Sequence, residues 1–193
     1  DGLFETMAVL QGTPRFWQGH VDRLTAGCEQ LGLPMTPQAV LLREVQTVSA
    51  GQRRCVVKII VTRGTSGRGY AITTPVRGNR VVCSWPWPQD PGDLVETGIR
   101  MRMCALRLGI QPMLAGLKHL NRLEQVMARA EWEDRSIHEG LLLDAEDYVV
   151  SAISSSLFLV SGGRLLTPRL DRCGVRGVMR RSMLNAFRER CEQ

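Results

Sequence analysis

The order of hydrophobic and polar residues predicts alternating strands and helices in the first part of the chain. Alternating apolar positions are typical of strands, and apolar residues three or four positions apart are typical of helices. A cap residue followed by proline marks the start of a helix. We therefore expect a strand at 5–10 closed by the turn Gln11-Gly12, helices at 17–31 and 35–48 (the second beginning at Thr36 and Pro37), and strands at 55–62 and 80–85.

The second part of the chain is expected to be richer in strands. Residues 86–92 contain three prolines and a glycine, which interrupt regular structure. Further on, an amphipathic helix follows Lys118, and its apolar stripe is expected to pack in the core. That stripe consists of Leu120, Leu123, Met127 and Ala130. The other expected elements are strands at 98–104, 140–144 and 148–153, a hairpin of 157–160 and 164–166, and a last helix at 175–190.

This order of elements predicts an α+β protein with two α/β domains. Consecutive hairpins after one helix favour a mostly antiparallel sheet in the second half. The proline-rich segment is the best candidate for a domain boundary. We expect a small N-terminal domain at 1–85, a linker at 86–93 and a larger C-terminal domain at 94–193.

Composition narrows the possible partners. The 193 residues include 25 Lys and Arg against 19 Asp and Glu, a net charge of +6, and only 5% are aromatic. The basic residues are spread along the chain, so an anionic small molecule explains them as well as nucleic acid does, and few rings are present to stack on bases. No apolar run approaches the roughly 18 residues of a membrane span, and no signal-peptide pattern is present. We expect a cytoplasmic protein that binds neither nucleic acid nor membrane.

The cysteines and histidines do not predict a metal site. Six cysteines are scattered without a C-x-x-C pair, and the three histidines lie far from them in sequence. Zinc sites and small disulfide frameworks both require closer and more regular spacing. We therefore expect no metal.

Lysine is rare in this chain, because Lys58 and Lys118 are the only lysines among the 25 basic residues. An amine that loses its proton can attack a carbonyl, whereas a guanidinium stays protonated. Lys118 lies in a short loop ahead of the amphipathic helix, so it is a candidate for a covalent bond to an aldehyde. The alternative is a surface cation in an arginine-rich chain. Lys58 lies within the expected strand 55–62, and we interpret it as structural.

Three segments are suited to anions, although none is specific by itself. Arg23 lies in the helix expected at 17–31, where a solvated arginine is the usual case. The loop Arg63–Tyr70 lacks the Gly-Lys-Ser/Thr ending of a P-loop, but its arginines can present guanidinium groups to carboxylates. Gly174 precedes the last expected helix, whose first amides favour negative charge. An amine combined with anion-binding elements is what pyridoxal phosphate requires.

The segment Leu114–Val126 closely resembles the lysine motif of the 4-amino-4-deoxychorismate lyase family, which consists of fold-type IV pyridoxal-phosphate enzymes. This motif and the Arg-Gly-Tyr loop are more specific to the lyases than to the related D-amino-acid and branched-chain transaminases. The similarity covers nearly the whole chain, including Asp1–Thr6, His20–Leu24, Arg63–Tyr70, Leu143-Asp144, Leu157-Phe158 and residues 167–177. The resemblance implies a fold-type IV architecture (D-amino-acid aminotransferase-like), with the cofactor at the interface of the two domains, and a homodimer.

The resemblance also implies roles for particular residues at the cofactor. Lys118 would be the lysine that binds pyridoxal 5′-phosphate covalently. Arg23 would bind the cofactor phosphate, together with the backbone and side chains around Gly174, Val175 and Arg176.

The implied reaction is the conversion of 4-amino-4-deoxychorismate into 4-aminobenzoate and pyruvate, a step of folate biosynthesis. The substrate amine would displace Lys118 from the cofactor. The freed lysine would then act as a base on the substrate carbon that bears the nitrogen. Thr6 would lie near the reacting carbon. Arg68 and Tyr70 of the glycine-rich loop would meet the substrate carboxylates.

The chain departs from the family pattern at two positions. Alignment from Lys118 puts Ser151 where the family has a glutamate that pairs with the pyridine nitrogen of the cofactor. Ser156 replaces an asparagine. The resemblance further implies that the first strand and the C-terminal part of the fold are absent. These departures leave open a D-amino-acid transaminase of the same fold, and a weakly active or non-catalytic scaffold.

Overall fold

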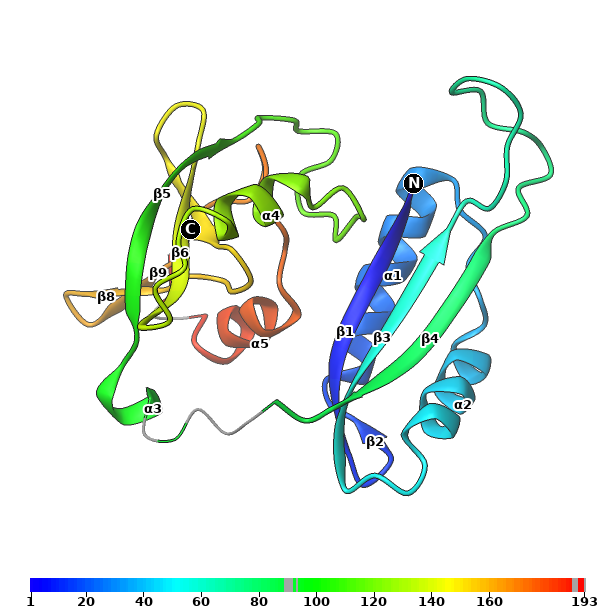
Figure 1. Ribbon diagram of the computed structural model, residues 1–193, viewed down its shortest axis with the longest axis horizontal. Coiled ribbons are helices and arrows are strands. Elements are labelled where there is room, and N and C mark those ends of the chain that lie inside the picture. Colours follow the sequence, from blue (N-terminus) through cyan, green and yellow to red (C-terminus); the bar gives the residue numbers. More distant parts are fainter. Residues whose placement is uncertain (89–91, 93, 189–190, 193) are drawn as a thin grey trace. The chain divides into compact units, whose positions relative to one another are not determined.

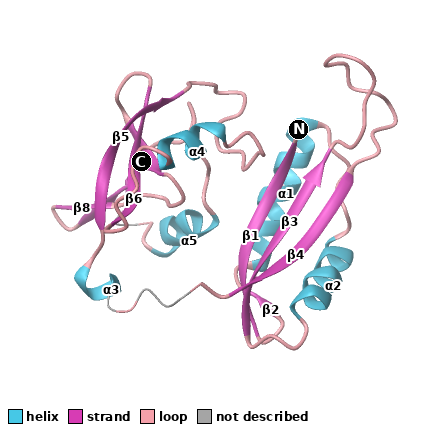
Figure 2. Cartoon of the chain, viewed as in Figure 1, coloured by secondary structure: helices cyan, strands magenta, loops and turns pink. Residues whose placement is uncertain are grey.

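The computed structural model describes residues 1–88, 92, 94–188 and 191–192, and the chain divides into two compact units (Figure 1). Unit 1 comprises residues 1–89 and 118–120, and unit 2 comprises residues 90–117 and 121–193. Both units combine strands with helices, as the sequence pattern predicts (Figure 2). Residues 89–91 and 93 of the expected linker lie outside the described residues.

Unit 1 is built on a four-stranded antiparallel sheet with the strand order β2-β1-β3-β4. Along β1, every second side chain from Leu3 to Val9 is buried, and the side chains between them are more exposed. This alternation is that of a sheet with one face covered, here by the helices α1 and α2 (Figure 1). The strands are β1 (Gly2–Leu10), β2 (Thr13–Pro14), β3 (Arg54–Thr62) and β4 (Asn79–Pro86), and the helices are α1 (Trp17–Leu31) and α2 (Gln38–Ser49).

Helix α1 has the bounds expected from its sequence. Val21, Leu24 and Cys28 lie three or four residues apart and are buried, so they form the stripe that packs on the sheet. The helix ends at Gly32, whose φ of 61° is left-handed and suits glycine. Helix α2 begins one residue later than expected, because Pro37 rather than Thr36 occupies the N-cap position.

Unit 2 contains two three-stranded sheets, with the strand orders β5-β6-β7 and β10-β9-β8. The pairs β5–β6 and β9–β10 are parallel, so the expectation of a mostly antiparallel sheet is wrong. The helix α4 lies between β5 and β6 in the chain, and such a crossover returns the second strand in the same direction. The elements are α3 (Leu94–Thr97), β5 (Arg100–Leu108), α4 (Leu123–Arg129), β6 (Ile137–Asp144), β7 (Val149–Ala152), β8 (Leu159–Ser161), β9 (Arg164–Leu166), α5 (Val178–Ala186) and β10 (Cys191–Glu192).

The apolar stripe expected around α4 is not core. Leu123 and Met127 are 69% and 56% exposed, whereas Ala128 is buried. Helix α4 starts at Leu123 and has only seven residues, and Ala128 is its one buried residue. Trp132, just after the helix, fills the adjacent space.

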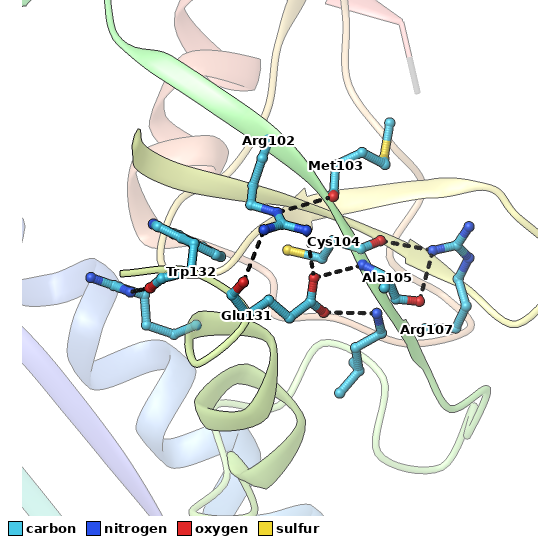
Figure 3. Close-up of polar contacts among 9 residues, drawn as sticks. Arg102, Met103, Cys104, Ala105, Arg107, Glu131 and Trp132 are labelled. Atoms are coloured by element: carbon cyan, nitrogen blue, oxygen red, sulfur yellow. Dashed lines mark hydrogen bonds and ion pairs between the residues drawn. The ribbon is translucent and has the colours of Figure 1, made fainter. Parts of the chain in front are cut away.

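A carboxylate secures an irregular part of β5 (Figure 3). The pairing of β5 with β6 shifts between Met103 and Arg107. There, the backbone amides of Ala105 and Leu106 donate hydrogen bonds to the Glu131 carboxylate at 2.8 and 2.9 Å. The Leu106 hydrogen bond is the largest of the effects that together lower the pKa of Glu131 below its ordinary value, despite partial desolvation. Glu131 thus supplies hydrogen-bond acceptors to β5 where its irregular pairing with β6 does not.

Candidate active site

Lys118 is held at the edge of the unit 1 sheet by backbone pairing with β1. The amide of Phe4 donates to the carbonyl of Lys118 at 3.0 Å, and the amide of Leu120 donates to the carbonyl of Gly2 at 2.9 Å. Leu3 and His119 form an antiparallel bridge between these two hydrogen bonds. The short segment therefore acts as an additional strand, and Lys118 lies directly opposite Phe4.

The side chain of Lys118 lies over an aromatic ring. Its Nζ is 4.3 Å from the centroid of the Phe4 ring. Strand alternation puts Thr6 on the same face of the sheet as Phe4, away from α1 and α2. We call this side of the sheet the lysine face, defined by Phe4, Thr6, Lys58 and Lys118. The structure thus brings together two predicted site residues, Lys118 and Thr6.

Arg23 lies on the helix-covered side of β1, bound to a buried carboxylate. Its Nε donates to Glu5 Oε1 at 2.7 Å, and its Nη2 donates to Glu5 Oε2 at 2.5 Å. His20 Nδ1 lies 2.6 Å from the same Oε2 atom. Burial raises the pKa of Glu5, but hydrogen bonds with Arg23 and His20 outweigh it, so the net pKa is below its ordinary value. An ionised Glu5 fixes the guanidinium of Arg23.

The predicted phosphate-binding residues of unit 2 lie before α5, not within it. The helix was expected from 175 but starts at Val178, because the preceding residues pair elsewhere. The Gly116 amide donates to the Gly174 carbonyl at 2.9 Å, and the Arg176 amide donates to the Gly116 carbonyl at 3.0 Å. The assignment of Gly174, Val175 and Arg176 to the cofactor phosphate stays a prediction.

The later start of α5 identifies amides that sequence reasoning missed. The Arg181 amide donates to the carbonyl of Gly177, the N-cap residue, at 3.0 Å. The amides of Val178, Met179 and Arg180 therefore precede the first helical hydrogen bond and form the positive end of the helix. The bridge at Val175 could not be foreseen, since it pairs residues nearly sixty positions apart.

Ser151 lies in β7, opposite Leu142 of β6, and its Oγ donates to the Ala152 carbonyl at 2.8 Å. Glu139 is a buried carboxylate of β6, but its oxygens accept hydrogen bonds from serine side chains and backbone amides. Its closest donor is Ser154 Oγ at 2.6 Å. Glu139 is thus occupied in a structural network, and Ser151 presents a hydroxyl where the resemblance implies a carboxylate.

The loop between β3 and β4 carries the two predicted substrate-binding residues. Arg68 and Tyr70 are both exposed. Tyr70 is among the most exposed large residues of the described chain. Their contact with substrate carboxylates stays a prediction.

Comparison with known proteins identifies the family. The model of the amino-transferase class IV family matches residues 2–192. The chain belongs to this family. It is 35% identical over 185 residues to the aminodeoxychorismate lyase of Vibrio harveyi, a match that covers 95% of the chain and 68% of that protein.

Solved structures agree with the family assignment. The 4-amino-4-deoxychorismate lyase of Pseudomonas aeruginosa is 46% identical, with a TM-score of 0.92 over 98% of this chain and 70% of that one. The branched-chain amino acid aminotransferase of Escherichia coli is 19% identical, with a TM-score of 0.83 over 100% of this chain and 67% of that one. The second match shows the fold alone. The fold-type IV architecture expected from the sequence is confirmed.

The residues present fit the cofactor of this family, pyridoxal 5′-phosphate. Lys118 supplies an amine whose backbone is fixed by two hydrogen bonds to β1. Within unit 1, Glu5 anchors the guanidinium of Arg23. Taken by itself, unit 2 has amides at the first turn of α5 of the kind that bind phosphate. No helix in the described part of the chain is long and apolar enough to cross a membrane.

Proposed function

We propose that this protein is an aminodeoxychorismate lyase that converts 4-amino-4-deoxychorismate into 4-aminobenzoate and pyruvate. The observation that carries the proposal is the position of Lys118, which lies within a lyase-like motif and is paired with β1 opposite Phe4. Lyases at 35% and 46% identity support the same activity. The two products together contain all atoms of the substrate, so the reaction needs no oxidant, reductant or second substrate.

Pyridoxal phosphate, when bound, supplies an aldehyde that condenses with the substrate amine and a ring that accepts electron density from the adjacent carbon. Lys118 holds the cofactor before the substrate arrives. Its released amine then takes a proton from the substrate carbon that bears the nitrogen, and it can return a proton as pyruvate leaves. Formation of the aromatic ring makes the elimination favourable.

The other assignments follow from charge and position. The assignment of the cofactor phosphate to Arg23 and to the segment of Gly174, Val175 and Arg176 rests on the family resemblance. Thr6 shares the lysine face with Lys118, where its hydroxyl is suited to orient the reacting group or a proton. Arg68 and Tyr70 are candidates for contacts with substrate carboxylates.

The test is an absorption spectrum with added pyridoxal phosphate, before and after borohydride, followed by peptide mapping and an assay for 4-aminobenzoate. We expect a visible band that borohydride converts into a stable adduct on Lys118, and product formation that the substitution Lys118→Ala abolishes. Lys58 provides the internal control, because it is the other lysine of the chain. An adduct on Lys58 alone, or full activity of Lys118→Ala, would contradict the proposal.

The remaining expectations from the sequence are part of this proposal. An assay with D-alanine and an oxo acid separates the lyase from a D-amino-acid transaminase, and a lyase gives no transamination comparable to its elimination rate. We propose a homodimer on the basis of the family resemblance, which light scattering checks. The cytoplasmic location stays a prediction.

A further inference from the structure

A groove in unit 1 runs between helix α1 and the segment that connects α1 to α2. Its volume is about 520 Å³, a size typical of sites for small organic molecules. The helices cover the face of the sheet opposite to the lysine face, so the groove is separate from the lysine face. Its wall on α1 includes Asp22, Ala26 and Glu29, and its other wall includes Met35 and Thr36.

The connecting segment returns along α1, which gives the groove its length. Gln38 Nε2 donates to Gln18 Oε1 at 3.3 Å, so α2 begins beside the first turn of α1. Residues 33–37 therefore lead back from the end of α1 towards its start. Gln18 Nε2 in turn donates to Asp22 Oδ1 at 2.7 Å, so hydrogen bonds between side chains hold this end of the groove.

The groove is negative, although the chain as a whole has a net charge of +6. Asp22 and Glu29 are the charged residues that line it. Arg80 donates to Thr36 Oγ1 at 2.7 Å, but its other nitrogens bind the carboxylate of Glu44 at 2.6 and 2.7 Å, which offsets its charge. A ligand that fits the groove therefore brings positive charge and hydrogen-bond donors.

Glu29 lies where a carboxylate is unfavourable for the helix itself. Helix α1 ends at Leu31, so Glu29 is in its last turn, where the helix dipole favours cations. This turn has no basic residue. The Glu29 side chain is exposed and makes no ion pair or hydrogen bond with another residue in the part of the chain that the structure describes. The stability of α1 therefore does not explain this carboxylate, and a bound cation would offset its charge.

The spacing of the two carboxylates sets the length of the ligand. Asp22 and Glu29 are seven residues apart, nearly two helical turns, so they lie on the same side of α1 and about 10.5 Å apart along its axis. Ala26 lies between them on α1, and Met35 lines the opposite wall. Methylene groups suit this apolar middle of the groove, and ammonium groups suit its two ends.

We propose that this groove binds a linear organic dication, with one ammonium group at Asp22 and the other at Glu29. An extended chain advances roughly 1.25 Å per bond, so the nine bonds between the terminal nitrogens of spermidine or 1,8-diaminooctane span about 11 Å. Both carboxylates are exposed, so the ion pairs are screened and we expect a Kd of about 0.1–1 mM. The site does not depend on the lyase assignment.

The test is an NMR titration of the full chain with four amines at low salt. Borohydride treatment beforehand leaves no cofactor aldehyde with which the amines could condense. We expect spermidine and 1,8-diaminooctane to bind about fivefold or more tightly than octylamine, which has one charge, and than 1,3-diaminopropane, whose nitrogens are only about 5 Å apart. Equal binding of octylamine and 1,8-diaminooctane would overturn the proposal, as would the absence of binding by both long dications at about 10 mM.

Substitutions in the groove locate the site. Asp22→Asn and Glu29→Gln each remove one charge with little change of shape, and each should weaken the binding of 1,8-diaminooctane about fivefold. Ala26→Leu fills the groove without a change of charge and should weaken binding as well. The matched control is Glu133→Gln, which removes an exposed carboxylate of unit 2 and should leave the affinity unchanged.

The outcomes of this series are distinct. Parental affinity in both Asp22→Asn and Glu29→Gln, with a parental melting temperature, would refute the site. An equal loss in Glu133→Gln would assign the binding to the overall charge of the protein and refute it too. A lysine peptide that binds where the dications do not would assign the groove to a protein partner instead.

Discussion

Glu5→Gln is expected to destabilise unit 1 strongly at neutral pH, because it removes the buried negative charge that pairs with the Arg23 guanidinium. The Glu5 side chain is 1% exposed and the Arg23 side chain 14%. Glutamine has nearly the same shape, but it carries no charge and turns an amide group towards one of the present donors. The substitution therefore isolates the carboxylate charge from packing.

The expected loss in the free energy of unfolding follows from the burial of the Glu5–Arg23 pair. Removing one partner of a buried ion pair costs about 3–5 kcal/mol, and the partial exposure of Arg23 lowers this to about 2–4 kcal/mol. Glu44 and Arg80 provide the matched control, because they form the same two-pronged pair at 2.6 and 2.7 Å in unit 1. The side chain of Glu44 is 33% exposed, so Glu44→Gln should cost only about 0–1 kcal/mol.

The pH dependence of the stability difference gives a second test of the role of the Glu5 charge. Since the folded pKa of Glu5 is lowered, its stabilising contribution is complete above the ordinary pKa of about 4.3 and is lost as pH falls through the folded pKa. The difference between the parent protein and Glu5→Gln should therefore be largest near neutral pH and shrink in acid.

The assay is urea unfolding followed by circular dichroism, at neutral pH and at several acidic values, for the parent protein and both variants. Equal losses for Glu5→Gln and Glu44→Gln would show that burial does not set the energy of the Glu5 pair. A Glu5→Gln loss that stays constant into acid would show that the ionised carboxylate is not what stabilises this part of the fold.

Two further substitutions test unit 2. Ser151→Glu should restore the carboxylate expected at the pyridine nitrogen and raise lyase kcat by about tenfold, measured as 4-aminobenzoate formation; unchanged or lower activity in a variant that binds the cofactor would argue against the alignment. Glu131→Gln should lower the free energy of unfolding by about 1–2 kcal/mol at neutral pH. Because the pKa of Glu131 is lowered, that loss should fade in urea titrations as pH falls below its ordinary value; a loss independent of pH would contradict this.

Elements whose signals are local could be predicted from the amino-acid order alone. Helix α1 was predicted at both ends from the spacing of its apolar residues. The hairpin of β8 and β9 was likewise predicted from its two glycines. The role of Lys118 was also predicted from the sequence, because an isolated amine in a distinctive motif can be recognised without its neighbours, and this role stays a prediction.

The contacts that individual residues make became visible only in the folded chain. Lys58 read as structural from its strand, yet it shares the Phe4 ring with Lys118, sixty residues later in the chain. From the helix pattern alone, a solvated arginine was the usual case for Arg23, yet it binds Glu5. The start of α5 moved because Val175 pairs with Gly116. Such contacts depend on which strands become neighbours. Helices and turns have local sequence patterns, but the pairing of distant segments has no periodic pattern in the local sequence.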